Sequence, residues 1–229
     1  EMQHAVPRED FRLLYDVGDD KVSARVVSHR PNEGEDGYFM ALVSPELPAD
    51  ADQVQPKTVI FVVDRSGSMS GKKIEQARNA LQFVLQNLNS GDLFNIVAYD
   101  SEVESFRPEL QRYNDKSRKQ AMGFVAGINA GGSTNLHGAL MRAMEMAPVD
   151  SEKPTYVVFL TDGRPTAGVT QEAAIVKEIK RANENGVRLY NFGVGFDVNS
   201  RLLDKLANGN RGFTNYVRPN EDIEDSVSK

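Results

Sequence analysis

Three oxygen-bearing side chains follow one strongly apolar segment at alternate positions. Residues 58–63 read TVIFVV, and Asp64, Ser66 and Ser68 come directly after them. Carboxylate and hydroxyl oxygens are hard donors, which suit a hard divalent cation such as Mg2+. Alternate positions in a tight turn allow the three groups to converge on one point. The triplet alone also fits a polar strand-to-helix turn in which a serine caps the helix.

The turn does not match three other functional motifs that occur between a strand and a helix. A phosphate-binding loop needs G-x-x-x-x-G-K-[ST], but Ser66 stands at the first glycine and Lys73 at the Ser/Thr. A serine-hydrolase elbow needs G-x-S-x-G, and the residue at the nucleophile position is Met69. An aspartyl-phosphate enzyme would use Asp64 as nucleophile and would want a second carboxylate in the same loop, where Ser66 stands. The turn therefore favours ion binding.

A second carboxylate follows another apolar run. Residues 156–160 read YVVFL, and Thr161, Asp162 and Gly163 come next, which repeats the pattern of the first run. In a doubly wound sheet the first and fourth main strands lie side by side, and ligands bind beyond their C-terminal ends. We therefore expect Asp64 and Asp162 to meet in one crevice, with Thr134 joining them from a third, glycine-rich loop.

The elements that must position these residues alternate between strands and helices. Each helical segment carries apolar residues three and four positions apart, which gives it one buried face. A two-residue link between two strands forbids a parallel crossover and implies one antiparallel edge strand. We predict an α/β fold with a doubly wound, mostly parallel, Rossmann-like sheet. Strands are expected at 57–63, 94–99, 102–106, 156–160, 187–194 and 213–217, helices at 71–89, 116–128, 135–146, 170–184 and 200–207, a loop at 108–115 and a last helical turn from Glu221.

The first part of the chain follows a different pattern. Residues 11–17, 22–28 and 38–43 alternate enough to be strands, which predicts a small antiparallel β extension laid on the main domain. We assign residues 1–56 to this extension and connector, and residues 57–229 to the α/β domain with its last helix truncated. The sequence begins at Glu1 without Met, so we interpret it as an excised piece of a longer protein.

Composition excludes several classes of site. The 229 residues carry a formal charge of −6, which argues against a generic nucleic-acid binder. The sequence has no cysteine, and its three histidines are too scattered for a recognisable zinc motif. No apolar run approaches the roughly 20 residues that a membrane helix needs, so we expect no membrane insertion by this segment.

At these positions the sequence resembles a known family. Asp64-x-Ser66-x-Ser68, Thr134 and Asp162 are similar to the metal-ion-dependent adhesion site of von Willebrand factor type A domains. The resemblance covers about residues 57–229. Segment 11–45 resembles the connector that precedes this domain in inter-alpha-trypsin-inhibitor heavy-chain-like proteins and their bacterial relatives.

The resemblance implies roles for these five residues. The three hydroxyls would bind Mg2+, or Mn2+ or Ca2+ in its place, and the two carboxylates would bind it directly or through water. Two carboxylates balance the charge of the ion, so one open coordination position would stay available for an Asp or Glu of a protein partner. The resemblance thus implies a metal-dependent adhesion module that is not an enzyme, in an extracellular or cell-envelope setting.

Alternative functions and roles stay open at this point. A Mg2+-dependent phosphoryl-transfer or hydrolytic enzyme would need a base or nucleophile, and His137 is the candidate, although we favour its interpretation as a surface or capped histidine. A structural domain with a vestigial metal site is a third possibility. Arg65 and Arg164 form either solvated loop charge or a basic rim that attracts an acidic partner. Lys72 and Lys73 are interpreted as a solvated helix start.

Overall fold

The computed structural model describes residues 22–29, 32, 34, 36–45, 55–149, 153–218 and 221. Contacts divide the chain into two compact units, residues 1–54 and residues 55–229. In the first unit, β1 (Val22–His29) pairs antiparallel with β2 (Tyr38–Pro45). This confirms the expected hairpin, while the strand expected at 11–17 lies outside the described residues. The assignment of residues 1–56 and 57–229 to two domains stays a prediction.

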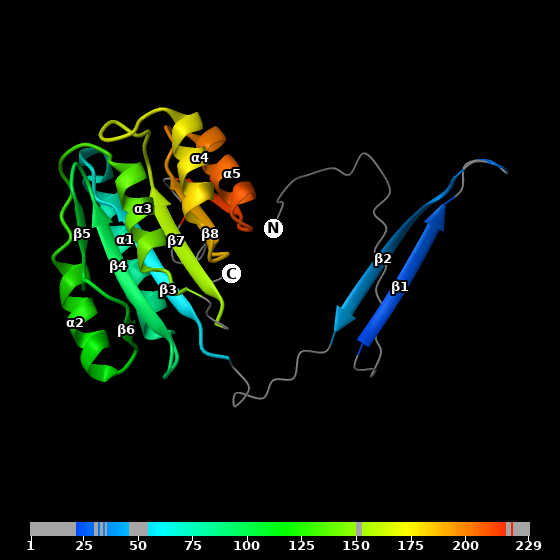
Figure 1. Cartoon of the computed structure of the whole chain (residues 1–229), viewed down its shortest axis with the longest axis horizontal. Coiled ribbons are helices and arrows are strands. Elements are labelled where there is room, and N and C mark those ends of the chain that lie inside the picture. The colour runs from blue at the N-terminus through cyan, green and yellow to red at the C-terminus, as the bar shows by residue number, and fades with distance from the viewer. Residues whose placement is uncertain are drawn as a thin grey trace, which may run out of the picture. The chain divides into compact units, whose positions relative to one another are not determined.

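The second unit contains one central sheet in the order β5-β4-β3-β7-β8-β9, with the short β6 also paired to β4 (Figure 1). Strands β4, β3, β7, β8 and β9 run parallel, whereas β5 and β6 are antiparallel to β4. This confirms the doubly wound order and the antiparallel edge strand. The strands are β3 (Thr58–Asp64), β4 (Leu93–Tyr99), β5 (Val103–Ser105), β6 (Gln111–Arg112), β7 (Thr155–Thr161), β8 (Arg188–Val194) and β9 (Thr214–Val217).

Helices cover both faces of this sheet and create two apolar cores. One core joins α1 and α2 to the sheet through residues such as Phe61 and Val63, and the other joins α3, α4 and α5 through Ile60 and Val62. All seven residues of β3 are buried, because the strand has a helical layer on each face. The helices are α1 (Lys72–Gln86), α2 (Asp115–Ala126), α3 (Leu136–Met146), α4 (Glu172–Ala182) and α5 (Ser200–Gly209), with a 3-10 turn η2 (Gly67–Met69) before α1.

Strand β6 corrects the prediction of a loop across residues 108–115. Leu93 pairs with Arg112 and Phe94 with Gln111. The buried Asn95 side chain donates hydrogen bonds to the carbonyls of Arg107 and Glu109, which holds this segment against β4. Two residues are too few to show a strand periodicity, so the sequence pattern gives no sign of this pairing.

Two further sequence predictions concern the C-terminal helical turn and membrane insertion. Glu221 is described as a bend, and residues 222–229, where a last helical turn was expected, lie outside the described residues. Within the part of the chain that the structure describes, every helix is too short or too polar to cross a membrane.

Candidate metal site

The sheet topology places the two predicted acids at the same edge. Asp64 is the last residue of β3, Asp162 follows the last residue of β7, and the two strands are parallel neighbours. Ser66 and Ser68 lie in the turn between β3 and α1, and Thr134 lies in the loop before α3. Four of the five predicted residues therefore lie at or just beyond the C-terminal ends of two adjacent strands, the usual position of a ligand crevice. The loop between α2 and α3 brings Thr134 to the same edge, where the backbone of this loop is hydrogen-bonded to Arg65 and Asp100.

The predicted hydroxyl groups face one another across these loops. Ser66 Oγ lies 3.1 Å from Ser68 Oγ, and Ser68 Oγ donates a hydrogen bond of 2.7 Å to Asp162 Oδ1. Thr134 Oγ1 and Ser68 Oγ would each lie 3.7 Å from a Cβ placed on Gly163, so both point into the space beside this glycine. The turn after β3 and the loop after β7 are thus joined through a serine hydroxyl.

Asp64 is completely buried and is held by three neutral donors. Its Oδ1 accepts a hydrogen bond of 2.8 Å from the Ser66 backbone N–H, and its Oδ2 accepts one of 2.6 Å from Thr161 Oγ1 and one of 3.2 Å from the Tyr99 hydroxyl. Burial raises the pKa of Asp64 above its ordinary value of 3.8, although the hydrogen bonds from Thr161 and Ser66 oppose the rise, and the nearby Asp162 adds to it. A cation placed between the two acids would relieve both unfavourable effects.

Asp162 has a different partner, a cation supplied by the chain. Lys73 Nζ, from the first turn of α1, lies 2.5 Å from Asp162 Oδ2 and 3.2 Å from the carbonyl oxygen of Ser68. The Asp162 side chain is fully buried, while 33% of the Lys73 side chain is exposed. This contact contradicts the expectation that Lys73 belongs to a solvated helix start. Lys72 remains exposed.

Backbone hydrogen bonds fix the loop that carries Thr134. Gly67 N donates to Gly132 O over 3.0 Å, and Gly131 N donates to Arg65 O over 2.8 Å, which ties this loop to the turn after β3. Gly132 has a φ of +76°, and a Cβ there would lie 3.1 Å from the Asp100 Cβ. The position therefore requires glycine, both for its backbone conformation and for its close approach to the β4–β5 connection.

Buried Met69 anchors the turn that carries the serines. The side chain of Met69 is fully buried in the core beneath α1 and α2. The η2 turn thus has one apolar residue directed inward between polar residues directed outward. We expect this anchor to limit the freedom of Ser66 and Ser68, as a preorganised site requires.

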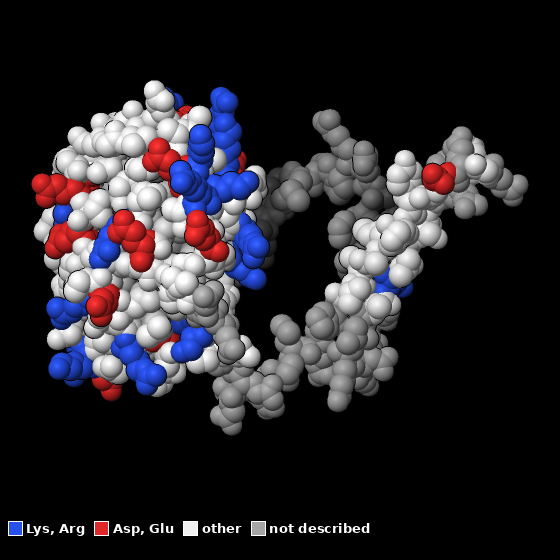
Figure 2. All heavy atoms as spheres, in the orientation of Figure 1, with Lys and Arg blue, Asp and Glu red and all other residues white. Residues whose placement is uncertain are grey.

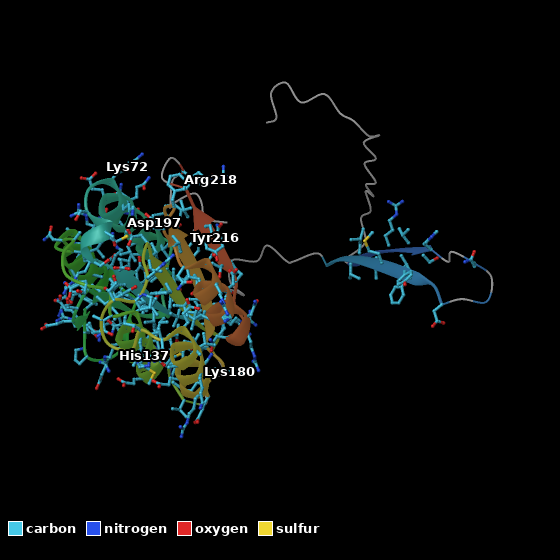
Figure 3. All side chains as sticks on the ribbon, turned by 90° about the horizontal axis from the view of Figure 1, so that it is seen from above. Lys72, His137, Lys180, Asp197, Tyr216 and Arg218 are labelled. Atoms are coloured by element: carbon cyan, nitrogen blue, oxygen red, sulfur yellow. The ribbon has the colours of Figure 1, made fainter. Side chains whose placement is uncertain are left out.

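A pocket of about 410 Å³ opens beside these groups. Asp197, which follows β8, stands on its rim without belonging to the predicted ligand set (Figure 3). The exposed Ser68 and the buried Thr134 and Asp162 all form part of the wall of this pocket. Its lining residues are Ser68, Lys73, Thr134, Asp162, Gly163, Arg164, Thr166 and Asp197.

The other predicted residues near the site have distinct partners. His137 Nε2 lies 2.7 Å from the Glu178 carboxylate of α4, and Figure 3 shows His137 well apart from Asp197. Arg65 forms ion pairs with Asp100, at 3.1 Å, and with Glu104, at 2.6 Å, so its charge is matched and it is neither free loop charge nor an open basic rim.

Arg164, unlike Arg65, could still form a basic rim beside the pocket. The Arg164 side chain is exposed and lines the pocket, which leaves the idea of a basic rim standing for this residue. On the face shown in Figure 2, basic and acidic side chains are mixed over most of the larger unit, and basic side chains gather along the edge formed by α4 and α5.

Thr161 and Tyr99 contact Asp64 although neither was predicted from the sequence to belong to the site, and Lys73 was predicted only as part of a solvated helix start. Thr161 immediately precedes the predicted acid, and Tyr99 pairs with Asp64 in the β3–β4 register, so strand alignment could have identified both as neighbours of the site. The contact of Lys73 has no comparable signal, because it depends on how a long side chain crosses from α1 to the loop after β7.

The donor set can be tested against the ion that it would hold. The described residues contain no group of three or more His, Cys, Asp or Glu side chains that could hold a metal ion. A metal at this edge would therefore need hydroxyl ligands in addition to Asp64 and Asp162. Two carboxylates and three hydroxyls are hard oxygen donors that suit Mg2+ or Ca2+ better than a soft metal. The ammonium of Lys73 against Asp162 shows that this position accommodates a cation, so the residues fit the expected group.

Comparison with known proteins places the chain in a family. A sequence profile described as the von Willebrand factor type A domain matches residues 57–216. The chain belongs to this family. It is 33% identical over 229 residues to inter-alpha-trypsin inhibitor heavy chain H4 of Homo sapiens, which covers 97% of this chain and 24% of that protein. The chain thus spans about a quarter of the length of this curated relative.

Solved structures show the same fold at low sequence identity. The von Willebrand factor type A protein from Catenulispora acidiphila matches with a TM-score of 0.67 and 20% identity, over 90% of this chain and 44% of that one. Proximal thread matrix protein 1 of the mussel byssus, described with a zinc-occupied MIDAS motif (the metal-ion-dependent adhesion site), matches with a TM-score of 0.56 and 17% identity, over 70% of this chain and 44% of that one. Domains of this family are typically protein-interaction modules.

Proposed function

We propose that this chain is a protein-binding module that depends on a divalent metal ion. The observation that carries the proposal is the convergence of two carboxylates and three hydroxyls from three loops, beside an open pocket. Ser66, Ser68 and Thr134 would bind the ion through their hydroxyls, and Asp64 and Asp162 would bind it directly or through water. Mg2+ is the best match to these donors, with Mn2+ or Ca2+ as substitutes.

Other residues would hold the proposed metal ligands in position. Thr161 and Tyr99 fix the orientation of the Asp64 carboxylate, and the ties between the 65–67 and 131–132 segments fix the distance between the serine turn and Thr134. When bound, the metal would supply an open coordination position for the carboxylate of a partner. Arg164 on the pocket rim would favour the approach of such an acidic group.

Two fold neighbours are described in terms that fit this proposal, one with a bound metal and one as an adhesin. The mussel protein is described with zinc in its MIDAS motif, and a further fold neighbour is described as the pilus adhesin SpaC of Lactobacillus rhamnosus GG, with a TM-score of 0.63. His137 was the candidate base for an enzyme, but it contacts Glu178 on α4 and is not among the residues that line the pocket. An extracellular setting and an acidic protein partner are part of the same proposal.

Calorimetry of the purified chain tests this function. We expect titration with Mg2+ or Mn2+ to show one binding site, and a saturating ion to raise the melting temperature, because a ligand of the folded state stabilises it by about 2.7 kcal/mol at a hundredfold excess over Kd. Asp162→Asn should abolish the binding. Asp197→Asn is the matched control, since it removes a carboxylate from the rim of the same pocket and should leave the affinity within about twofold. A wild-type chain that binds neither ion would overturn the proposal.

A further inference from the structure

The charge of Asp162 is already matched by the chain itself. The Lys73 ammonium contacts Asp162 Oδ2 at 2.5 Å, and Ser68 Oγ donates to the opposite oxygen, Oδ1, at 2.7 Å. The carboxylate is buried, so an unpaired negative charge there would be costly. Lys73 therefore supplies the compensating charge that a bound metal ion would otherwise supply.

The fold directs Lys73 to this position and keeps its neighbour away from it. Lys73 lies in the first turn of α1 and reaches toward the loops that follow β7 and β8, where a Cβ on Gly195 would stand 3.4 Å from its Cε and Nζ. Gly195 has a φ of +102°, so this position is suited to glycine and leaves room for the lysine. Lys72, one residue earlier, is exposed and lies outside the pocket lining.

We propose that Lys73 sets the affinity of the proposed metal site by acting as a tethered competitor of the ion. Its ammonium neutralises Asp162 when no divalent ion is bound, and it opposes the binding of that ion because a second positive charge must share or replace it at the carboxylate. The inference rests on the proposed function and adds a residue that is not itself a ligand. It makes the affinity of the site lower than the five ligands alone would give.

Two opposite consequences follow from this competition. Removing the ammonium should raise metal affinity, because the ion no longer displaces a favourable ion pair. The same change should destabilise the metal-free protein, because Asp162 stays buried without a partner. A lysine with a merely structural role would produce the second effect without the first.

Titration calorimetry with Mg2+ and with Mn2+ on the whole 229-residue chain tests the inference. We expect Lys73→Met to bind about tenfold more tightly than the wild type, and Lys73→Arg, which keeps the charge, to stay within about threefold of it. Lys72→Met is the matched control, because it removes the same charge one residue away and should change affinity by less than about twofold. A Lys73→Met affinity equal to or below that of Lys72→Met would overturn the inference.

Folding of the variants is checked in the same samples. Circular dichroism melts with chelator should show a lower melting temperature for Lys73→Met, and melts with saturating Mg2+ should show a larger metal-induced rise than in the wild type. If Lys73→Met does not fold, Lys73→Gln replaces it, since the amide keeps a hydrogen-bond donor for Asp162 without the charge. The same affinity ranking is required of it, and its absence overturns the inference.

The outcomes separate this inference from the proposed function. If the wild type and all variants fail to bind either ion, the proposed metal site is wrong. If the wild type binds and the Lys73 variants bind no more tightly than the Lys72 control, the metal site stands and only the role of Lys73 is wrong.

Discussion

The two acids of the candidate site lie at equivalent ends of neighbouring strands and have different environments. Asp64 is held by neutral donors that are fixed by β3, β4 and β7, namely Ser66 N–H, Tyr99 and Thr161. Asp162 is held by the Ser68 hydroxyl and by the long, partly exposed Lys73 side chain. One carboxylate is therefore fixed by the framework of the sheet, and the other is paired with a group that is able to move away.

This difference suggests that Asp64 and Asp162 have different roles in the proposed metal site. The Asp64 side would define where an ion sits, because its partners leave the carboxylate little rotational freedom. The Asp162 side would decide how readily the ion is accepted, because a charged competitor occupies it. A site assembled in this way is preorganised in position and adjustable in affinity.

Removal of Asp64 should have the largest effect on stability. Asp64→Ala leaves buried donors without an acceptor, and we expect a loss of about 3 kcal/mol in the free energy of unfolding. Asp162→Ala should cost only about 1 kcal/mol, because Lys73 regains water when its partner is removed. Urea denaturation with chelator measures both. Equal losses for the two variants would contradict the distinction between the two sides of the site.

The neutral donors of Asp64 give the next largest effect. Thr161→Val keeps the shape of the side chain and removes the 2.6 Å hydrogen bond, so it should lower the free energy of unfolding by about 1.5 kcal/mol. Tyr99→Phe removes the longer 3.2 Å bond and should cost about 1 kcal/mol or less. Both should weaken Mg2+ binding in calorimetry by loosening Asp64. A variant as stable as the wild type with unchanged metal affinity would show that this donor does not position Asp64.

Asp92 is a third buried carboxylate, and it is paired with a lysine away from the proposed metal site. Asp92 accepts hydrogen bonds from Lys57 N, Lys57 Nζ and Asn89 N. Burial alone would raise the pKa of Asp92, but the hydrogen bonds from Lys57 and Asn89, together with the charge of Lys57, outweigh it and hold the pKa below the ordinary value of 3.8.

The lowered pKa of Asp92 predicts the sign of a pH effect. A carboxyl whose pKa is lower in the folded state adds stability above its unfolded pKa, near 3.8, and this stability disappears as the pH falls through the folded pKa. We expect Asp92→Asn to be less stable than the wild type at pH 6 by on the order of 1 kcal/mol, and the difference to shrink at pH 2 to 3. Urea denaturation across this range measures it. A difference that does not depend on pH would contradict the assigned ion pair.

The smallest expected effect concerns His137, the only base considered for an enzymatic function. Its imidazole contacts the partly exposed Glu178 carboxylate between α3 and α4, and even a charged pair in such a position contributes only about 0–1 kcal/mol. His137→Ala should therefore change the free energy of unfolding by less than about 1 kcal/mol and leave Mg2+ affinity within about twofold. Calorimetry and urea denaturation measure these two quantities. Loss of metal binding in this variant would place His137 at the site after all.

The sequence predicted the parts of the site that depend on strand order. Two apolar runs, each ending in an acid, were enough to expect β3 and β7 as neighbours, because a doubly wound sheet has one switch point. The antiparallel β5 followed from a link too short for a crossover. These features depend on segments that are long enough to show a periodicity.

The remaining features depend on tertiary contacts that no local pattern encodes. The pairing of Lys73 with Asp162 requires a helix start and two loop ends to come together, with Gly195 leaving room. The two residues of β6 are held by the Asn95 side chain and not by any pattern of their own. In each case one side chain crosses between elements that are distant in the sequence.

In the proposed site, the oxygens of Asp64, Ser66, Ser68, Thr134 and Asp162 surround one divalent ion. Anomalous diffraction from crystals of this chain grown with Mn2+ would locate that ion. We expect one strong peak bordered by these five side chains, with Lys73 Nζ displaced from or sharing Asp162 Oδ2. A map in which the five side chains keep their metal-free contacts without a peak between them, at saturating Mn2+, would contradict the proposed site.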